Sequence, residues 1–144
     1  MSGHTNDDRL AAFEDECRRR GLALTIQRRA VYGELVGRKD HPTADQVYDA
    51  LYARLPGLSR TTVYRVLDTL VEQGFARNVH HVGAVARFDP MTARHHHLVC
   101  DGCGRLVDLD DHAVAGLRLP DAGRTGFKIR DYSISFTGLC RDCR

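Results

Sequence analysis

Apolar residues recur every three or four positions in four segments of the first half of the chain. This spacing places them along one face of an amphipathic helix. It predicts helices over residues 8–20 and 27–36, a third helix that begins after Thr43, and a fourth that begins after Ser59. Thr43 is followed three positions later by Gln46, and side chains at this spacing cap the first turn of a helix. We therefore expect four helices before the first strand.

Strand-like patterns replace the helical ones further along. Residues 76–81 and 85–89 are two short β-like stretches around a three-residue turn, which predicts a hairpin. After Pro90 we expect strands over residues 98–100, 105–109 and 127–139, with a short helical piece over residues 111–117. In the last stretch the apolar positions change from odd to even numbers, which indicates a bulge near Asp131.

The order of these elements predicts an α+β fold. Helices followed by a hairpin are typical of a winged helix-turn-helix, and we assign this domain to residues 1–88. A hinge is expected over residues 89–94, and a small α/β domain over residues 95–144.

Composition adds only broad limits. The 144 residues are 42% hydrophobic and 28% charged, with a formal net charge of +2, so the total charge does not by itself indicate nucleic acid. No apolar run approaches the roughly 18 residues of a transmembrane helix, and the polar N-terminus lacks the apolar region of a signal peptide. We expect a cytoplasmic protein with no membrane contact.

Four of the five cysteines form two Cys-x-x-Cys pairs, Cys100 with Cys103 and Cys140 with Cys143. Each pair can direct two thiolates at one ion, and four thiolates match tetrahedral Zn²⁺. Redox or disulfide motifs are the alternative, but neither pair opens a helix in a βαβ unit. We expect a structural Zn(Cys)4 site that holds together a domain with a small core.

A second group of metal-binding side chains surrounds the run His95-His96-His97. Residues two apart in a strand share a face, so His95 and His97 can converge while His96 points away. Imidazoles combined with carboxylates suit Fe²⁺ or Mn²⁺ better than the cysteine site does. The expected ligands are His41, Asp89, His95, His97 and Asp108. A solvated surface is the alternative for such a run, and it is the interpretation we give to His4, His80, His81 and His112.

The fourth expected helix has the pattern of a DNA-recognition helix. Its apolar stripe leaves the opposite face polar. Hydroxyl groups and free amides in a first helical turn suit phosphate contacts, while tyrosine and arginine further along suit base contacts in the major groove. The candidate DNA-contacting residues are Ser59, Arg60, Thr61, Thr62, Tyr64 and Arg65.

Several of these motifs together resemble the ferric uptake regulator family over nearly the whole chain. They are Leu-Thr-Ile-Gln-Arg at 24–28, His-Pro-Thr-Ala at 41–44, Thr-Thr-Val-Tyr-Arg-Val-Leu at 61–67, Arg-Phe-Asp at 87–89, His-His-His-Leu-Val-Cys at 95–100 and both Cys-x-x-Cys pairs. The resemblance implies a regulator that is not an enzyme, with a C-terminal dimerisation domain. It implies a homodimer that binds a palindromic DNA operator when loaded with metal, and it adds Arg28 to the DNA contacts.

Within the family, three histidines and two aspartates resemble the sensing site of the peroxide-responsive branch, whereas iron-uptake sensors more often carry glutamate at the acidic positions. The resemblance implies that peroxide reacts at bound Fe²⁺ and oxidises His41 or His95, which releases DNA, and that Mn²⁺ supports DNA binding without this oxidation. The alternative is an iron-uptake repressor that responds to Fe²⁺ level alone.

Two departures from the family pattern limit what is carried over. Many relatives have a basic residue that reaches the minor groove where this chain has Ala23. A further metal site of some relatives needs a histidine and a glutamate where this chain has Arg94 and Ala115, so we expect two metal sites per subunit. From other classes, a non-haem iron oxygenase and a zinc-stapled adaptor without a DNA role also remain open.

Overall fold

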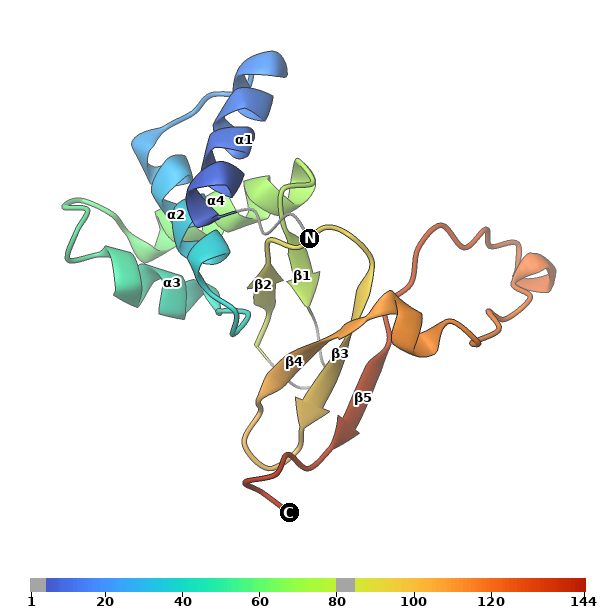
Figure 1. Ribbon diagram of the computed structural model, residues 1–144. Coiled ribbons are helices and arrows are strands. Elements are labelled where there is room, and N and C mark those ends of the chain that lie inside the picture. The colour runs from blue at the N-terminus through green and yellow to red at the C-terminus, as the bar shows by residue number, and fades with distance from the viewer. Residues whose placement is uncertain (1–4, 80–84) are drawn as a thin grey trace. The chain divides into compact units, whose positions relative to one another are not determined.

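The structure is a computed structural model that describes residues 5–79 and 85–144. The chain divides into two compact units, Met1–Thr92 and Ala93–Arg144 (Figure 1). Within the described residues, no helix is both long enough and apolar enough to span a bilayer.

The first unit contains the four expected helices: α1 (Asn6–Arg19), α2 (Ile26–Gly37), α3 (Ala44–Leu51) and α4 (Arg60–Glu72). A Ser or Thr side chain caps the N-terminus of each, and the capping box of Thr43 and Gln46 is present. The first helix begins two residues earlier than predicted. The reason is a second capping box, in which the side chains of Thr5 and Asp8 each accept a hydrogen bond from the backbone N–H of the other residue.

Two short antiparallel strands follow the helices, β1 (Arg77–Val79) and β2 (Arg87–Asp89). Asp89 lies opposite Arg77, at the end of this ladder. The expected turn over residues 82–84 lies outside the described residues, as do His4, His80 and His81.

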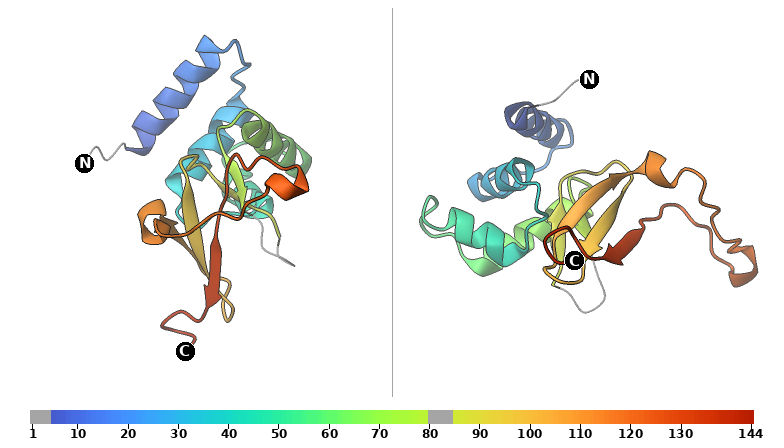
Figure 2. Two further views of the ribbon diagram at one scale, coloured as in Figure 1. Left: turned by 90° about the vertical axis from the view of Figure 1, so that its right-hand side faces the viewer. Right: turned by 60° about the horizontal axis from the view of Figure 1, so that its bottom comes forward.

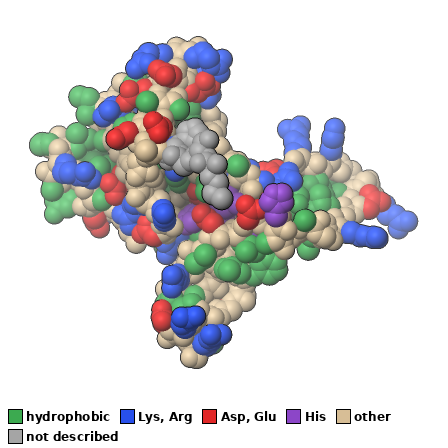
Figure 3. Space-filling model, viewed as in Figure 1, with side chains coloured by type: hydrophobic (Ala, Val, Ile, Leu, Met, Phe, Trp, Pro, Cys, Tyr) green, Lys and Arg blue, Asp and Glu red, His purple; other side chains and the backbone are tan. Residues whose placement is uncertain are grey.

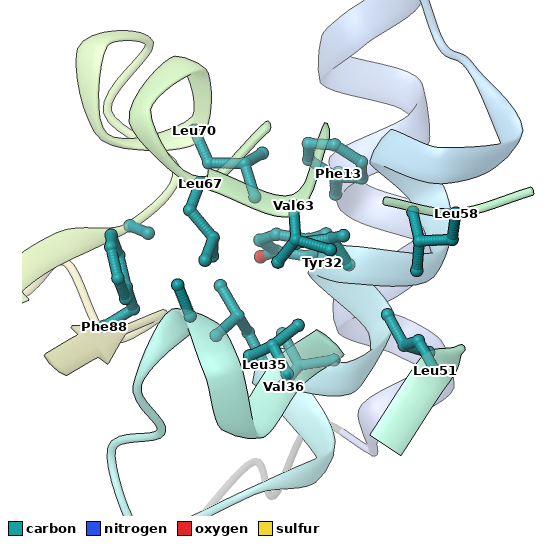
Figure 4. Packing of buried hydrophobic residues seen from close by; sticks show 14 of the residues in the cluster. Phe13, Tyr32, Leu35, Val36, Leu51, Leu58, Val63, Leu67, Leu70 and Phe88 are labelled. Atoms are coloured by element: carbon teal, nitrogen blue, oxygen red, sulfur yellow. The ribbon is translucent and has the colours of Figure 1, made fainter. Parts of the chain in front are cut away.

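The core of the first unit lies where α2 packs against α1, α3 and α4 (Figure 4). The rings of Phe13 and Tyr32 stack with centroids 4.0 Å apart, and Phe75 meets Phe13 edge-on at 4.8 Å. Leu35 and Leu67 are fully buried beside them. Burying one face of α4 in this way fixes which of its side chains are left for solvent.

The second unit is built on a three-stranded sheet of β3 (His95–Cys100), β4 (Leu106–Asp110) and β5 (Ser135–Gly138) (Figure 1). The strand order is β4-β3-β5, with β3 antiparallel to β4 and parallel to β5. The first strand is longer than the predicted 98–100, because the three histidines also pair with β4.

The segment between β4 and β5 corrects two predictions. Only the 3₁₀ turn η1 (Asp111–Val114) forms where a helical piece over residues 111–117 was expected, and the expected strand over residues 127–139 is a strand only from Ser135. The segment leaves the sheet at η1 and passes through a second turn, η2 (Gly123–Thr125), before it returns at β5 (Figure 2). The residues that interrupt regular structure here are Gly116, Pro120, Gly123 and Gly126.

One face of this sheet is apolar and exposed. Leu98, Val107, Phe136 and Leu139 are each between 42% and 56% exposed and line a cavity of about 270 Å³. Hydrophobic side chains gather over the sheet in the space-filling view (Figure 3). An apolar surface of this kind is typical of a protein–protein contact.

Candidate metal centres

The two Cys-x-x-Cys pairs meet because β3 and β5 run in the same direction. Cys100 is the last residue of β3 and lies opposite Gly138 of β5, so the turns that follow the two strands lie at the same edge of the sheet. One ligand atom from each of the four cysteines lies within 4.8 Å of the others. None of the chain's five cysteines is in a disulfide.

The spacing of the sulfur atoms fits a tetrahedral zinc site. The Sγ atoms of Cys103 and Cys140 are 3.8 Å apart. Two thiolates bound at about 2.3 Å to one Zn²⁺ with tetrahedral geometry are about 3.8 Å apart. Close packing of the turns requires Gly102, where an added Cβ would lie 2.9 Å from the Cβ of Cys143.

The electrostatics of the cluster also favour a cation. Backbone N–H donors, first that of Cys140 at 3.3 Å and then that of Cys103, lower the pKa of Cys100 to about 6. The neighbouring sulfur atoms of Cys140, Cys100 and Cys103 raise the pKa of Cys143 to about 12. The Cys143 thiol therefore does not ionise near neutral pH by itself, and a bound divalent cation would stabilise its thiolate.

A second group of donors lies at the other end of β3. His95 and His97 share a face, and their Nε2 atoms are 3.1 Å apart. Asp108 pairs with His97 across β3 and β4, and its Oδ1 atom lies 3.7 Å from both Nε2 atoms. Ligands bound at about 2.1 Å to one ion are about 3.0 Å apart when they subtend a right angle at the ion and about 3.6 Å apart when they subtend about 120°. These three side chains therefore fit one divalent cation.

The backbone fixes which ring nitrogen of His95 is available. Its Nδ1 atom lies 2.9 Å from the carbonyl oxygen of Ala93, which can only accept a hydrogen bond. The proton therefore resides on Nδ1, and the lone pair of Nε2 points toward His97 and Asp108. A histidine ligand oriented through its second nitrogen is the usual arrangement at protein metal sites.

The first unit contributes a separate buried pair, His41 and Asp89. The Nε2 atom of His41 lies 3.1 Å from Oδ2 of Asp89, while the backbone N–H of Met91 donates to Oδ1 at 2.7 Å. This pair again offers one nitrogen atom and one oxygen atom that can bind a metal ion, and the two atoms face each other. The predicted ligand set is therefore divided, with two side chains in the first unit and three in the second.

The backbone at His41 is held in an unusual conformation. Its φ of +51° lies in the left-handed region, which residues other than glycine rarely adopt. Arg87 donates to the carbonyl oxygens of His41 at 3.1 Å and Asp40 at 3.3 Å. Arg87 was not among the predicted site residues, although a residue two positions before Asp89 in a strand shares its face.

The candidate DNA-contacting residues fall into three groups. Thr61, Tyr64 and Arg65 are exposed on α4. Ser59 and Thr62 cap the helix through each other, with the N–H of Thr62 donating to Oγ of Ser59 at 3.1 Å. The two remaining arginines, Arg60 and Arg28, bind other parts of the first unit.

Arg60 is engaged with α3. It donates to Asp45 at 2.6 Å and to Asp49 at 3.4 Å, and its guanidinium lies 4.5 Å from the ring centroid of Tyr48. Arg28 donates to the carbonyl oxygen of Ala23. Arg60 therefore links α4 to α3, and Arg28 binds the backbone just before α2. The predicted DNA contacts of these two arginines did not include these structural roles.

Replacing Gly102 with alanine should weaken zinc binding. The added methyl would press on Cys143, and overpacking of this kind costs about 1–3 kcal/mol. We expect faster zinc loss to a chelator, measured by elemental analysis after timed exposure. The control is Gly116→Ala, where an added Cβ meets nothing within 4 Å. Equal zinc retention by both variants would contradict the close packing of the turns.

Comparison with known proteins agrees with the geometry. The sequence profile of the Ferric uptake regulator family matches residues 19–137. The chain is 34% identical to the peroxide operon regulator of Bacillus subtilis (strain 168), over 99% of this chain and 96% of that protein. It is 31% identical to a peroxide-responsive repressor PerR of Staphylococcus saprophyticus, over 88% of this chain and 86% of that protein.

Two solved structures with similar sequence identity to this chain share its fold. A zinc uptake regulator in complex with zinc and DNA is 28% identical, with a TM-score of 0.74 over 96% of this chain and 94% of that one. PerR from Streptococcus pyogenes, described for peroxide sensing and gene regulation, is 27% identical, with a TM-score of 0.55 over 94% and 92% of the two chains. From the match over most of its length, the chain belongs to the ferric uptake regulator family, whose members are regulators rather than enzymes.

Proposed function

We propose that this protein is a metal-dependent DNA-binding repressor that senses peroxide. The observation that carries the proposal is the meeting of the Nε2 atoms of His95 and His97 beside Asp108. The 34% identity to a peroxide operon regulator favours peroxide as the signal. In this proposal Cys100, Cys103, Cys140 and Cys143 hold a structural zinc that is not part of the response.

The regulatory ion is Fe²⁺ or Mn²⁺, held by His41, Asp89, His95, His97 and Asp108. Five nitrogen and oxygen donors without a thiolate suit these harder ions. Because two of the ligands belong to the first unit and three to the second, binding one ion links the units. The ion then favours those arrangements of the units that bring both sets of donors together, which is a shift of population toward the DNA-binding form.

The side chains determine what peroxide does at this site. Ferrous iron, when bound, would activate hydrogen peroxide, so that one peroxide oxygen is added to a ligand imidazole and the other leaves as water. The hydrogen bond from Nδ1 to Ala93 directs Nε2 of His95 toward His97 and Asp108, and Arg87 holds the turn at His41, so both imidazoles would be ligands within reach of the peroxide. An imidazole that gains an oxygen atom loses its fit as a ligand, and the link between the units is broken.

The DNA contacts are assigned to α4. Its exposed face carries Thr61, Tyr64 and Arg65, and Arg60 braces it against α3. We propose that a homodimer reads a palindromic operator, with the apolar sheet face of the second unit as part of the contact between copies. A repressor of this kind acts in the cytoplasm, where the chromosome lies.

The decisive experiment treats the Fe²⁺ protein with peroxide. Trypsin releases His41 on residues 40–54 and His95 on residues 95–105. After the cysteines are alkylated, we expect the mass of one added oxygen on one or both peptides, which fragmentation assigns to His41 or His95. His96 serves as an internal control on the second peptide, and the Mn²⁺ protein should stay unmodified. Operator release by iron depletion alone, with no added oxygen, would instead identify an iron-level repressor.

Replacing Tyr64 and Arg65 with alanine should abolish operator binding while zinc content is unchanged. Removing one side chain that reads a base edge costs about 1–3 kcal/mol of binding free energy. Binding is measured by fluorescence anisotropy at fixed salt. The control is Glu72→Ala, at the other end of α4. A double variant that binds the operator as the wild type does would support the adaptor interpretation.

Arg87→Met should weaken Mn²⁺ binding. Without its two hydrogen bonds, the turn at His41 relaxes from its left-handed conformation and the ligand moves. Loss of an outer partner of a ligand typically lowers metal affinity about 10–100-fold. Isothermal titration of the zinc-loaded protein with Mn²⁺ measures the change. Lys39→Met removes an exposed charge near the same turn and should bind Mn²⁺ normally, so an equal loss in both variants argues for a general charge effect.

A further inference from the structure

The middle histidine of the triplet has partners of its own. His96 is completely buried, on the face of β3 opposite His95 and His97. Its Nε2 atom lies 2.9 Å from Oδ1 of Asp111, and its Nδ1 atom lies 3.2 Å from the backbone nitrogen of Ile134. Both ring nitrogens are therefore engaged by the protein.

These partners determine the state of the ring. A backbone N–H can only donate, so Nδ1 of His96 is the acceptor from Ile134. The ring proton then resides on Nε2 and is donated to the carboxylate of Asp111. No lone pair is left for a metal ion, which separates His96 from the two histidines that flank it.

The contacts continue through Tyr132. Its ring stacks on His96 with centroids 5.7 Å apart and an angle of 19° between the planes. The guanidinium of Arg94 lies 4.5 Å from the same ring centroid, and its Nε atom donates to Asp131 at 3.0 Å. Arg94 and Asp131 are both partly exposed, so packing on the ring contributes more than their opposite charges. We call this set the His96 latch; its members are Arg94, His96, Asp111, Asp131 and Tyr132.

The latch holds the residues on both sides of a ligand. Arg94 and His96 flank His95 in the sequence, and both pack on Tyr132. Contacts that hold the residues on both sides of His95 limit how far the backbone at His95 can rotate. Asp111 starts the segment that joins β4 to β5, and Tyr132 lies near its end, so the latch also ties both ends of that segment to β3.

We propose that the His96 latch is a positioning device for the regulatory metal site, which sets the directions of the His95 and His97 rings without contacting the ion. This inference rests on the proposed function of that site. The latch acts on ligands through the backbone of β3, so its loss should change affinity and coordination geometry at the regulatory site. The zinc cluster at the opposite end of the strand should keep its metal.

The test compares four variants of the full-length, zinc-loaded protein. Asp111→Ala removes the acceptor of His96, and Tyr132→Ala removes the stack. Tyr132→Phe keeps the ring, and His112→Ala removes an exposed neighbour outside the latch. We expect the first two to bind Mn²⁺ about 10–100-fold more weakly, with altered Co²⁺ d–d absorption bands, and the last two to match the wild type.

Readouts without regulatory metal complete the test. Imidazole ¹⁵N shifts of the zinc protein should show the proton of His96 on Nε2 and that of His95 on Nδ1, and the His95 assignment should be lost in Asp111→Ala. Wild-type affinity and Co²⁺ bands in both latch variants would overturn the positioning role, as would zinc loss in step with manganese loss. A His95→Ala variant separates the two proposals: if it binds Mn²⁺ normally, the regulatory site itself is wrong and the latch has nothing to position.

Discussion

The extended backbone of β3 is the constraint on which the second unit depends. Alternate side chains of a strand point to opposite faces, so six residues serve three purposes. His95 and His97 present metal donors on one face, and His96 is engaged by the protein on the other. Cys100 ends the strand at the edge where parallel pairing with β5 brings the second pair of cysteines. A shift of one residue in register would exchange the two faces and disrupt both sites.

Much of this structure can be predicted from side chains that lie close together in the sequence. Helix starts are encoded by capping side chains a few residues apart, which is why the four helices are found close to their predicted positions. The zinc cluster needs only two short turns whose ligands are adjacent in sequence. The choice of His95 and His97 over His96 follows from the two-residue period of a strand, and the register with β4 places Asp108 opposite His97.

Tertiary partners explain what the sequence did not reveal. Arg60 has the position of a phosphate contact, but the carboxylates of Asp45 and Asp49 come from another helix whose placement no local pattern indicates. Alternating apolar residues predicted a strand before Ser135, yet a strand forms only where a neighbour supplies backbone partners. Phe127 is 76% exposed, which agrees with a segment that has no such neighbour within its own described unit.

The length of β3 also affects which side chains peroxide can oxidise. At about 3.3 Å per residue, Cys100 lies about 10 Å along the strand from His97 and about 17 Å from His95. In the proposed mechanism, peroxide would therefore oxidise a nearby imidazole rather than a thiolate. The strand would then keep the zinc-binding thiolates away from the site where peroxide reacts. One histidine of the chain could be oxidised while its zinc stays bound.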